Sequence, residues 1–387
     1  MSQRLDVVVV GAGIIGAACA LECASRGLRT AVVEGSGVAS GATGAAMGHI
    51  VLMDDSPAQL ALTLYSQKLW QELASRLPGD VELEHPGTLW IAADEGEMRE
   101  VHRKHHSLAA AGVASEILDC NALAEAEPHL RRPLAGALLV SSDTVLDPTS
   151  AASWLIQQAV AAGIVMHAPR KVVSAGEGRV ALEDGSELHA PHIVIACGAE
   201  SAAVVPGLPI RKRKGHLAIT DSRPGMIRHQ LVELGYLTSA HATTADSVAF
   251  NVQPRRSGQI LVGSSRQFGD EEHAVNPKIL SAMVERAKLY LPEIGSCPLL
   301  RSWAGFRAAT PDKLPLIGPW PSNPTLLLAT GHEGLGITTS LATARLIADH
   351  ITGAKTAIPR EPYLPERLVR SAPDSTAQAI QPLTEAR

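Results

Sequence analysis

Cysteine, long apolar runs and positive charge are all scarce in this chain of 387 residues. Its 5 cysteines are odd in number and include no C-x-x-C pair, which argues against a disulfide framework and a zinc site. Such usage favours a reduced, cytoplasmic setting. Apart from a glycine motif near the N-terminus, no apolar stretch reaches the roughly 18 residues of a membrane span. The net charge of −5, with one short basic run at 211–214, excludes a nucleic-acid-binding face.

The N-terminus carries the strongest positive signal, a strand followed by a glycine-rich turn and a helix. Four valines at 7–10 suit a strand that is buried on both faces. Gly11, Gly13 and Gly16 follow with G-x-G-x-x-G spacing. In this context the first glycine permits a tight turn, the second lets the backbone approach a pyrophosphate, and the third lets the helix pack on the strand. Ile14 and Ile15 stand where the helix N-terminus faces the phosphates.

A secretory signal peptide is an alternative interpretation of this N-terminal segment, because residues 7–21 are apolar. Glu22 interrupts that run, and a second strand at 30–33 continues the dinucleotide-binding order, so we reject the signal. Glu34 ends the second strand, where it can accept hydrogen bonds from a ribose diol and would repel the 2′-phosphate of NADP.

A run of small residues at 35–48 directly follows Glu34. Because the side chains of this segment are small, its backbone can closely approach a large planar or phosphorylated ligand. NAD-binding folds seldom need such a segment, whereas a flavin must be threaded past it, so the run favours FAD. The cofactor contacts expected here are Ser40, Thr43, Ala46, Met47, Gly48 and His49.

The remaining pattern predicts two interleaved units. Strands at 192–197 and 325–330, the latter leading into a helix at 337–352, return to the dinucleotide-binding unit, whereas residues 209–297 are mostly β. We predict an α/β plus α+β fold in which a Rossmann-like FAD-binding domain of the glutathione-reductase type is interrupted by an antiparallel-sheet substrate domain. The expected boundaries are 1–85, 142–210 and 298–360 for the FAD-binding domain, 86–141 and 211–297 for the substrate domain, and 361–387 for an extended tail.

A predicted helix at 95–111 carries three histidines between 102 and 106. No cysteine or carboxylate completes a ligand set at metal spacing. We therefore expect a solvated helix face there and no metal site in the protein.

Motifs at both ends of the chain resemble the D-amino-acid oxidase superfamily. The glycine motif with Glu34, the valines at 172–173, the Ala-Cys-Gly-Ala at 196–199 and the blocks at 303–318 and 330–337 follow that family's order. The branch contains glycine oxidase, sarcosine oxidase and the catalytic subunits of hydrogen cyanide synthase and opine oxidase. Residues 48–59 most resemble bacterial D-hydroxyproline dehydrogenases, and the likeness extends from residue 5 to about 355.

The resemblance implies FAD and the oxidation of a C–N bond beside a carboxylate. Arg307 matches the arginine that binds the substrate carboxylate, for which a guanidinium fork is well suited. Residues 334–337 would offer backbone N–H groups to the flavin pyrimidine, in a position that favours the negative charge of the reduced ring. Residues 304–306 lack the cysteine that attaches flavin covalently in sarcosine oxidases, so FAD is expected to be non-covalent. The remaining cofactor contacts implied are Val172, Val173, Ala196, Gly198, Gly334, Leu335, Gly336 and Ile337.

The favoured activity is oxidation of a D-amino or cyclic imino acid to the imine by hydride transfer to flavin N5, with cis-4-hydroxy-D-proline or D-proline as substrate. Alternatives are oxidation of glycine or sarcosine, or a role as the catalytic subunit of an opine oxidase or hydrogen cyanide synthase-like complex. Two alternative functions of a different kind are an NAD-linked dehydrogenase and a non-catalytic flavoprotein subunit. The catalytic candidates are Arg307, His49, Tyr236 and His332, and Asn251 and Glu333 are further candidates for the pocket.

The partners expected are a small-molecule substrate and, in the complex, electron-accepting subunits. The sequence is compatible with either a homo-oligomer or a hetero-oligomer. We expect a cytoplasmic protein, with peripheral attachment to the inner membrane as the alternative.

Overall fold

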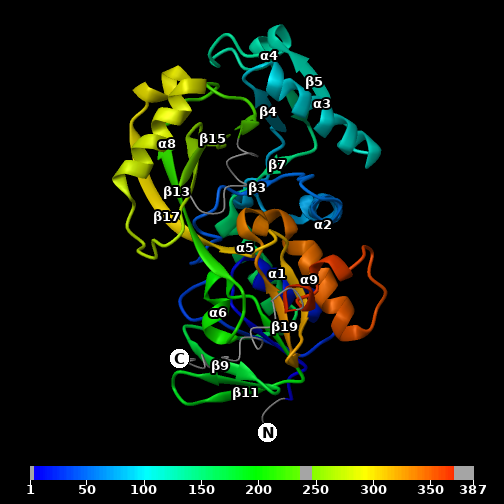
Figure 1. Cartoon of the computed structure of the whole chain (residues 1–387). Helices are drawn as coiled ribbons and strands as arrows, with labels where there is room; N and C mark the ends of the chain where they lie inside the picture. Colours follow the sequence, from blue (N-terminus) through cyan, green and yellow to red (C-terminus); the bar gives the residue numbers. More distant parts are fainter. Residues whose placement is uncertain (1–3, 236–245, 370–387) are drawn as a thin grey trace, which may run out of the picture.

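The computed structural model describes residues 4–235 and 246–369, which form two large sheets joined by several crossings of the chain (Figure 1). The first sheet has six strands, all parallel except for one antiparallel edge strand. Its central strand is fully buried because it has neighbours on both sides and packed layers on both faces. In spatial order the strands are β18 (Leu316–Trp320), β19 (Asn323–Thr330), β12 (His192–Ile195), β1 (Val7–Val10), β2 (Thr30–Val33) and β8 (Val165–His167).

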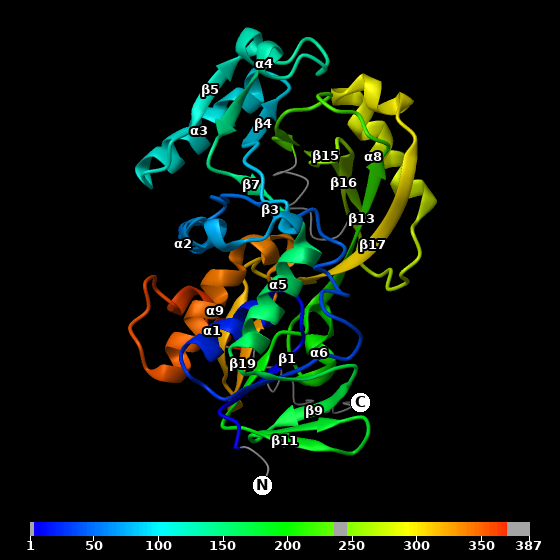
Figure 2. The ribbon, with the colours of Figure 1, turned by 180° about the vertical axis from the view of Figure 1, so that it is seen from behind.

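Helices cover one face of this sheet and a small sheet covers the other (Figure 2). Helix α1 (Ile14–Ser25) is apolar on nearly all sides because it is enclosed by the sheet, α5 (Pro148–Ala161) and α9 (Gly336–Thr352). Helix α2 (Pro57–Leu73) packs against α9. The opposite face carries a three-stranded antiparallel sheet of β9 (Val172–Gly176), β10 (Arg179–Leu182) and β11 (Glu187–His189).

The second sheet has eight strands and lies in the upper half of Figure 1. Its neighbours are antiparallel except for one parallel pair, β14 with β4, so the expectation of an antiparallel sheet holds for all other pairings. In spatial order the strands are β17 (Leu299–Ala309), β13 (Arg211–Thr220), β16 (Ile260–Arg266), β15 (Ser247–Pro254), β14 (Gln230–Glu233), β4 (Thr88–Ala92), β6 (Gly136–Val140) and β5 (Glu116–Asp119).

Helices close only part of this second sheet. Helix α8 (Pro277–Tyr290) and the short α4 (Cys120–Ala126) pack on one face, through residues such as Met283 and Leu123. Helix α3 (Glu95–Ala110) packs on the opposite face beside β4 and β6. The rest of that opposite face is turned toward the six-stranded sheet. The short elements are η1 (Ala74–Arg76), η2 (Gly79–Val81), β3 (His49–Ile50), β7 (Thr144–Val145), η3 (Gly198–Glu200), α6 (Ser201–Val204), η4 (Pro292–Ser296), η5 (Glu333–Leu335), η6 (Glu361–Tyr363) and α10 (Glu366–Val369).

Two segments differ from the boundaries predicted from sequence. The boundary predicted at 298 assigns residues 299–309 to the FAD-binding domain, but strand β17 pairs along β13 as an edge strand of the eight-stranded sheet. The predicted extended tail begins with η6 and α10 instead. Tyr363 is buried there, and its hydroxyl donates to the carbonyl of Ala58 at 2.7 Å, which anchors the segment. The rest of that tail, 370–387, lies outside the described residues.

Within the described ranges, no helix combines the length and the apolar character needed to cross a bilayer.

Candidate active site

A cavity of about 1360 Å³ lies between the two sheets. Its lower wall is formed where β1, β2, β12 and β19 end, at Gly11, Glu34, Ala196 and Thr330. In open parallel sheets, ligands bind outside the carboxyl ends of the strands. The upper wall is the uncovered face of the eight-stranded sheet.

The glycine motif has the geometry that its spacing predicts. Gly11 has a φ of +105°, and a Cβ at this position would lie 2.7 Å from the carbonyl oxygen of Ala196. A Cβ on Gly16 would lie 2.0 Å from the carbonyl oxygen of Gly11, so the helix can approach the strand only with glycine here. Gly13 is the N-cap residue of α1 and lines the cavity. The positive end of the α1 dipole therefore points into the cavity.

Glu34 is held with its carboxylate at the edge of the cavity. One carboxylate oxygen accepts the N–H of Ala12 at 2.8 Å, and the other accepts the N–H of Ser36 at 2.8 Å. Each oxygen can accept a further hydrogen bond, so the group can bind the hydroxyls of a ribose.

The small residues at 35–48 serve packing as well as access to the cavity. A Cβ on Gly48 would lie 1.9 Å from the carbonyl oxygen of Leu146, and one on Gly305 of β17 would lie 2.4 Å from the Cβ of Ala45. The hydroxyl of Thr43 accepts the N–H of Ile14 at 3.0 Å. Its own hydrogen can therefore be donated to an oxygen inside the cavity.

A cross-strand row of residues forms the upper wall. Directly paired residues share one face of a sheet, which is why residues distant in sequence meet here. In this row, the Oδ1 of Asn251 accepts a hydrogen bond from the Nε2 of Gln230. The amide NH₂ group of Asn251 can therefore donate to a ligand in the cavity. From β4 to β17 the row runs Trp90, Val232, Asn251, Gly263, Leu217 and Trp303.

Arg307 is fixed at the end of this wall. Its Nη1 donates to the carbonyl of Ser265 at 2.9 Å. The guanidinium lies over Gly215, where a Cβ would be 2.5 Å from Nη1 and from Nη2. On the adjacent strand, Arg213 forms a buried ion pair with Glu333 in the loop before α9. The ion pair ties the eight-stranded sheet to that loop, which contributes Gly334 to the cavity.

His49 and His332 are both neutral at physiological pH, because burial lowers the pKa of each to about 3. The Nε2 of His49 lies 2.8 Å from the hydroxyl of Thr88. The Nε2 of His332 lies 2.9 Å from the hydroxyl of Thr343 in α9, a contact that fixes the loop rather than presenting that nitrogen to a substrate. Tyr236 lies outside the described residues.

The structure brings nearly all of the predicted site residues to one cavity. Gly16 is the exception among those described, because it packs against Gly11 behind the wall. Those that line the cavity are Gly11, Gly13, Ile14, Ile15, Glu34, Ser40, Thr43, Ala46, Met47, Gly48, His49, Val172, Val173, Ala196, Gly198, Arg307, His332, Gly334, Leu335, Gly336 and Ile337.

Sequence reasoning missed several polar residues of the site. Arg266 is buried and lines the cavity from β16. Lys104, assigned from sequence to a solvated helix face, is 1% exposed, bonds to Asp54 and lies with its Nζ 4.7 Å from the centre of the Trp90 ring. Thr88 and Asp143 lie behind His49. Their contacts join distant segments, so no local spacing could have signalled them.

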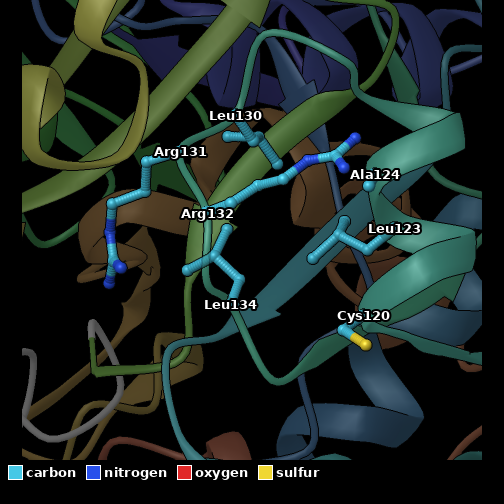
Figure 3. A pocket seen from close by; sticks show the side chains of 7 residues that line it. All are labelled: Cys120, Leu123, Ala124, Leu130, Arg131, Arg132 and Leu134. Atoms are coloured by element: carbon cyan, nitrogen blue, oxygen red, sulfur yellow. The ribbon is translucent and has the colours of Figure 1, made fainter.

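The described residues offer neither a metal site nor a second cavity large enough for a substrate. No cluster of metal-ligating side chains occurs among them. A second hollow, beside α4, has a volume of about 10 Å³, which is room for about one water molecule. Figure 3 shows the residues that line it: Cys120, Leu123, Ala124, Leu130, Arg131, Arg132 and Leu134.

The cavity fits FAD by its own geometry. Its lower end combines the backbone cradle at Gly11, the N-terminus of α1 and the carboxylate of Glu34, and it continues past the small-residue segment to the N-terminus of α9. A dinucleotide site that opens onto a wall with a fixed arginine fits a flavin-dependent oxidoreductase. The sequence pattern of the DAO family, FAD dependent oxidoreductase, matches residues 6–350. The chain belongs to this family and is an FAD-dependent enzyme.

Individual relatives agree with this assignment. Glycine oxidase from Geobacillus kaustophilus is 28% identical over 378 residues, which cover 94% of this chain and 97% of the relative. A crystal structure of glycine oxidase from the same species has a TM-score of 0.84 at 26% identity and covers 94% of this chain and 98% of its own. The HcnC subunit of hydrogen cyanide synthase from Pseudomonas aeruginosa is 26% identical, covering 90% of this chain and 92% of its own.

Proposed function

We propose that the protein oxidises a cyclic D-imino acid, with cis-4-hydroxy-D-proline favoured and D-proline next, using non-covalently bound FAD. The observation that carries the proposal is the set of three polar anchors on the cavity wall: the guanidinium of Arg307, the amide of Asn251 and the imidazole of His49. A substrate such as glycine needs partners for one carboxylate and one amine. A third anchor suits a further polar group, such as a ring hydroxyl.

The side chains of this enzyme bind and orient rather than form covalent bonds. Arg307 holds the carboxylate in a bidentate fashion, which limits how the α-carbon can turn. Val232 and Leu217 offer apolar surface to the ring carbons. Bound FAD supplies the acceptor for the hydride that leaves the α-carbon. The substrate must react with its nitrogen deprotonated, because the lone pair of that nitrogen becomes the second bond of the product imine.

A second candidate is oxidation of an opine, or of another amino acid with two carboxylates, as the catalytic subunit of a larger complex. The buried Arg266 favours this candidate, because a second guanidinium in the cavity suits a second carboxylate. The similarity to HcnC supports a role as one subunit of an assembly. In such a complex, partner subunits would take the electrons.

Anaerobic mixing of the purified protein with candidate substrates tests both proposals. The panel contains cis-4-hydroxy-D-proline, D-proline, glycine, sarcosine, D-alanine and an opine, and the measurement is bleaching of the oxidised-flavin absorbance. Fast bleaching by the cyclic imino acids supports the first proposal, and bleaching by the opine alone supports the second. Bleaching by glycine or sarcosine in preference to both would overturn them. Admitting air to the bleached sample then tests oxygen as the electron acceptor.

We also propose a cytoplasmic location. All five cysteines are free thiols, and Cys19 and Cys23 are buried close together in α1 without forming a disulfide. This fits a reducing compartment. Fractionation of the native host, with the protein followed by its flavin absorbance and by antibody, tests this location against peripheral attachment to the inner membrane.

A further inference from the structure

A buried side-chain amide faces one end of the cavity and has no part in the steps above. Gln59, in the first turn of α2, is 4% exposed and lines the cavity. Within the described ranges, neither the Oε1 nor the Nε2 of Gln59 forms a hydrogen bond, and both atoms are open to the cavity rather than sealed in the core. Burying an amide without a partner is costly, so its position in the wall calls for a functional reason.

The local sequence offers this amide a partner that it does not use. Ser56 is the N-cap residue of α2, and its hydroxyl accepts the N–H of Gln59 at 3.1 Å. In a Ser-x-x-Gln capping box, the glutamine side chain also turns back to the backbone N–H of the serine. That return bond does not occur among the described residues, because the side chain of Gln59 extends to the cavity instead. The helix cap therefore depends on the backbone of Gln59, and its amide can bind a ligand.

The segment before α2 places this amide away from the other polar anchors of the site. Alternate side chains of this segment face the cavity, as in an extended strand, and these are Met47, His49, Val51, Met53 and Asp55. The hydroxyl of Thr63 in α2 lies 3.3 Å from the backbone N of Met53 and 3.0 Å from the carbonyl oxygen of Gln59. Gln59 therefore lies beside Met53, which is separated from His49 by up to about 13 Å of extended chain. A ligand group at this amide is remote from the carboxylate that Arg307 would hold.

The charges around this end of the cavity favour a neutral group over a second carboxylate. Asp55 lines the same end and is exposed. Lys104 and Arg103 of α3 are both paired with Asp54. The described lysines and arginines that line the cavity come from other segments, and these are Arg170, Lys171, Arg266, Arg301, Arg307 and Lys313. A carboxylate at Gln59 would face Asp55 without a cation, whereas a hydroxyl can donate to the amide oxygen or accept from the amide nitrogen.

We propose that Gln59 is a specificity-determining residue whose amide binds a neutral polar group of the substrate, such as a hydroxyl, on the carbon skeleton away from the carboxylate. The carbons of the skeleton contact one packed apolar cluster on the wall, which includes Val51, Met53, Trp90, Val232 and Leu335. A substrate without the polar group leaves the buried amide unpaired, and that cost supplies the selectivity. The inference rests on amino- or imino-acid oxidation in this cavity.

The selectivity of flavin reduction in the holoenzyme tests the proposal. The kcat/KM for anaerobic bleaching is measured with cis-4-hydroxy-D-proline and with D-proline, which differ by one ring hydroxyl. Gln59→Met keeps the length of the side chain and removes the amide. We expect the ratio of the two kcat/KM values to fall by about tenfold in this variant, the equivalent of one hydrogen bond. The kcat/KM for D-proline should stay within about threefold of the wild type, because no bond to this substrate is lost.

Three controls separate recognition of the substrate from other roles of this side chain. Gln157 is exposed on α5, so Gln157→Met is the matched substitution and should leave the ratio unchanged. Removing an unpaired buried amide should leave the urea midpoint of Gln59→Met unchanged or raise it, and a marked fall would give Gln59 a structural role instead. The flavin-to-protein ratio should equal that of the wild type, and loss of FAD from Gln59→Met would make the amide a cofactor contact. Either of these two results would overturn the inference.

Binding of unreactive ligands supplies a second readout. Cyclopentanecarboxylate and cis-3-hydroxycyclopentanecarboxylate share a carboxylate, lack the nitrogen and differ by the hydroxyl, and their Kd values are read from the change in the flavin spectrum. The wild type should prefer the hydroxylated ligand by about tenfold, and Gln59→Met should lose this preference. A Kd ratio that is the same in both proteins would overturn the inference. Failure of the proposed function is seen separately, as no flavin bleaching by any amino or imino acid while the Kd ratio still depends on Gln59.

Discussion

Replacing Gly215 by alanine should impair the enzyme although it removes no charged group. The added Cβ would lie 2.5 Å from the Nη1 of Arg307, and ordinary contact requires about 3.4 Å or more, so the guanidinium must move by about 1 Å. A displacement of that size in a positioning group can cost about 100-fold in rate. Gly215 does not need a positive φ, so the backbone tolerates alanine and FAD should remain bound.

The assay is stopped-flow reduction of the flavin by the best substrate of the panel, without oxygen, at several substrate concentrations. We expect Gly215→Ala to lower kcat/KM by about 100-fold. Arg307→Lys, which keeps the charge but loses the bidentate geometry, should lose a similar factor of roughly 10 to 100. Gly79→Ala is the matched control, because nothing lies within 4 Å of its added Cβ.

A double-mutant cycle separates positioning from general damage. If Gly215→Ala acts by displacing Arg307, the two substitutions combined should cost much less than the product of their separate effects. A kcat/KM for Gly215→Ala within about threefold of the wild type would refute the reasoning. Multiplicative losses in the double variant would show that the alanine acts elsewhere.

Three further predictions concern the cofactor site, the buried ion pair and the buried carboxyl. Gly16→Ala places a Cβ 2.0 Å from the Gly11 carbonyl oxygen, so the purified protein should contain little FAD, and a normal flavin-to-protein ratio would contradict this. Lys104→Met leaves Asp54 buried with only the exposed Arg103 as its charged partner and should cost about 3 kcal/mol in urea unfolding; a loss below about 1 kcal/mol would be inconsistent with the pair. The pKa of Asp143 is raised to about 7 in the folded protein, so its contribution to stability is complete below the pKa of the unfolded state and is lost as pH rises toward 7. The free energy of unfolding of the wild type should therefore fall by up to about 1.4 kcal/mol per pH unit relative to Asp143→Asn in this range. Parallel curves of stability against pH for the two proteins would contradict a raised pKa of Asp143.

The sequence by itself determined the cofactor end of the protein. Gly11, Gly13 and Gly16 are required by backbone conformation and close approach, which depend on a few neighbouring residues and therefore leave a local pattern. Glu34 follows from the same unit, because a strand of fixed length carries it to the sheet edge. Arg307 was found through the order of motifs, although periodicity alone did not place its strand in the correct sheet.

Only the tertiary structure decided the substrate wall. Asn251 and Val232 face the cavity because of strand register, and a shift of one residue would turn both to the other face. Register depends on packing summed over the whole sheet, to which each short segment contributes little. The contacts of His49 with Thr88, and of Asp143 with Leu52 and Gln67, join segments far apart in the chain. Their burial and the raised pKa of Asp143 follow from that assembly, which is why no local spacing in the sequence predicts them.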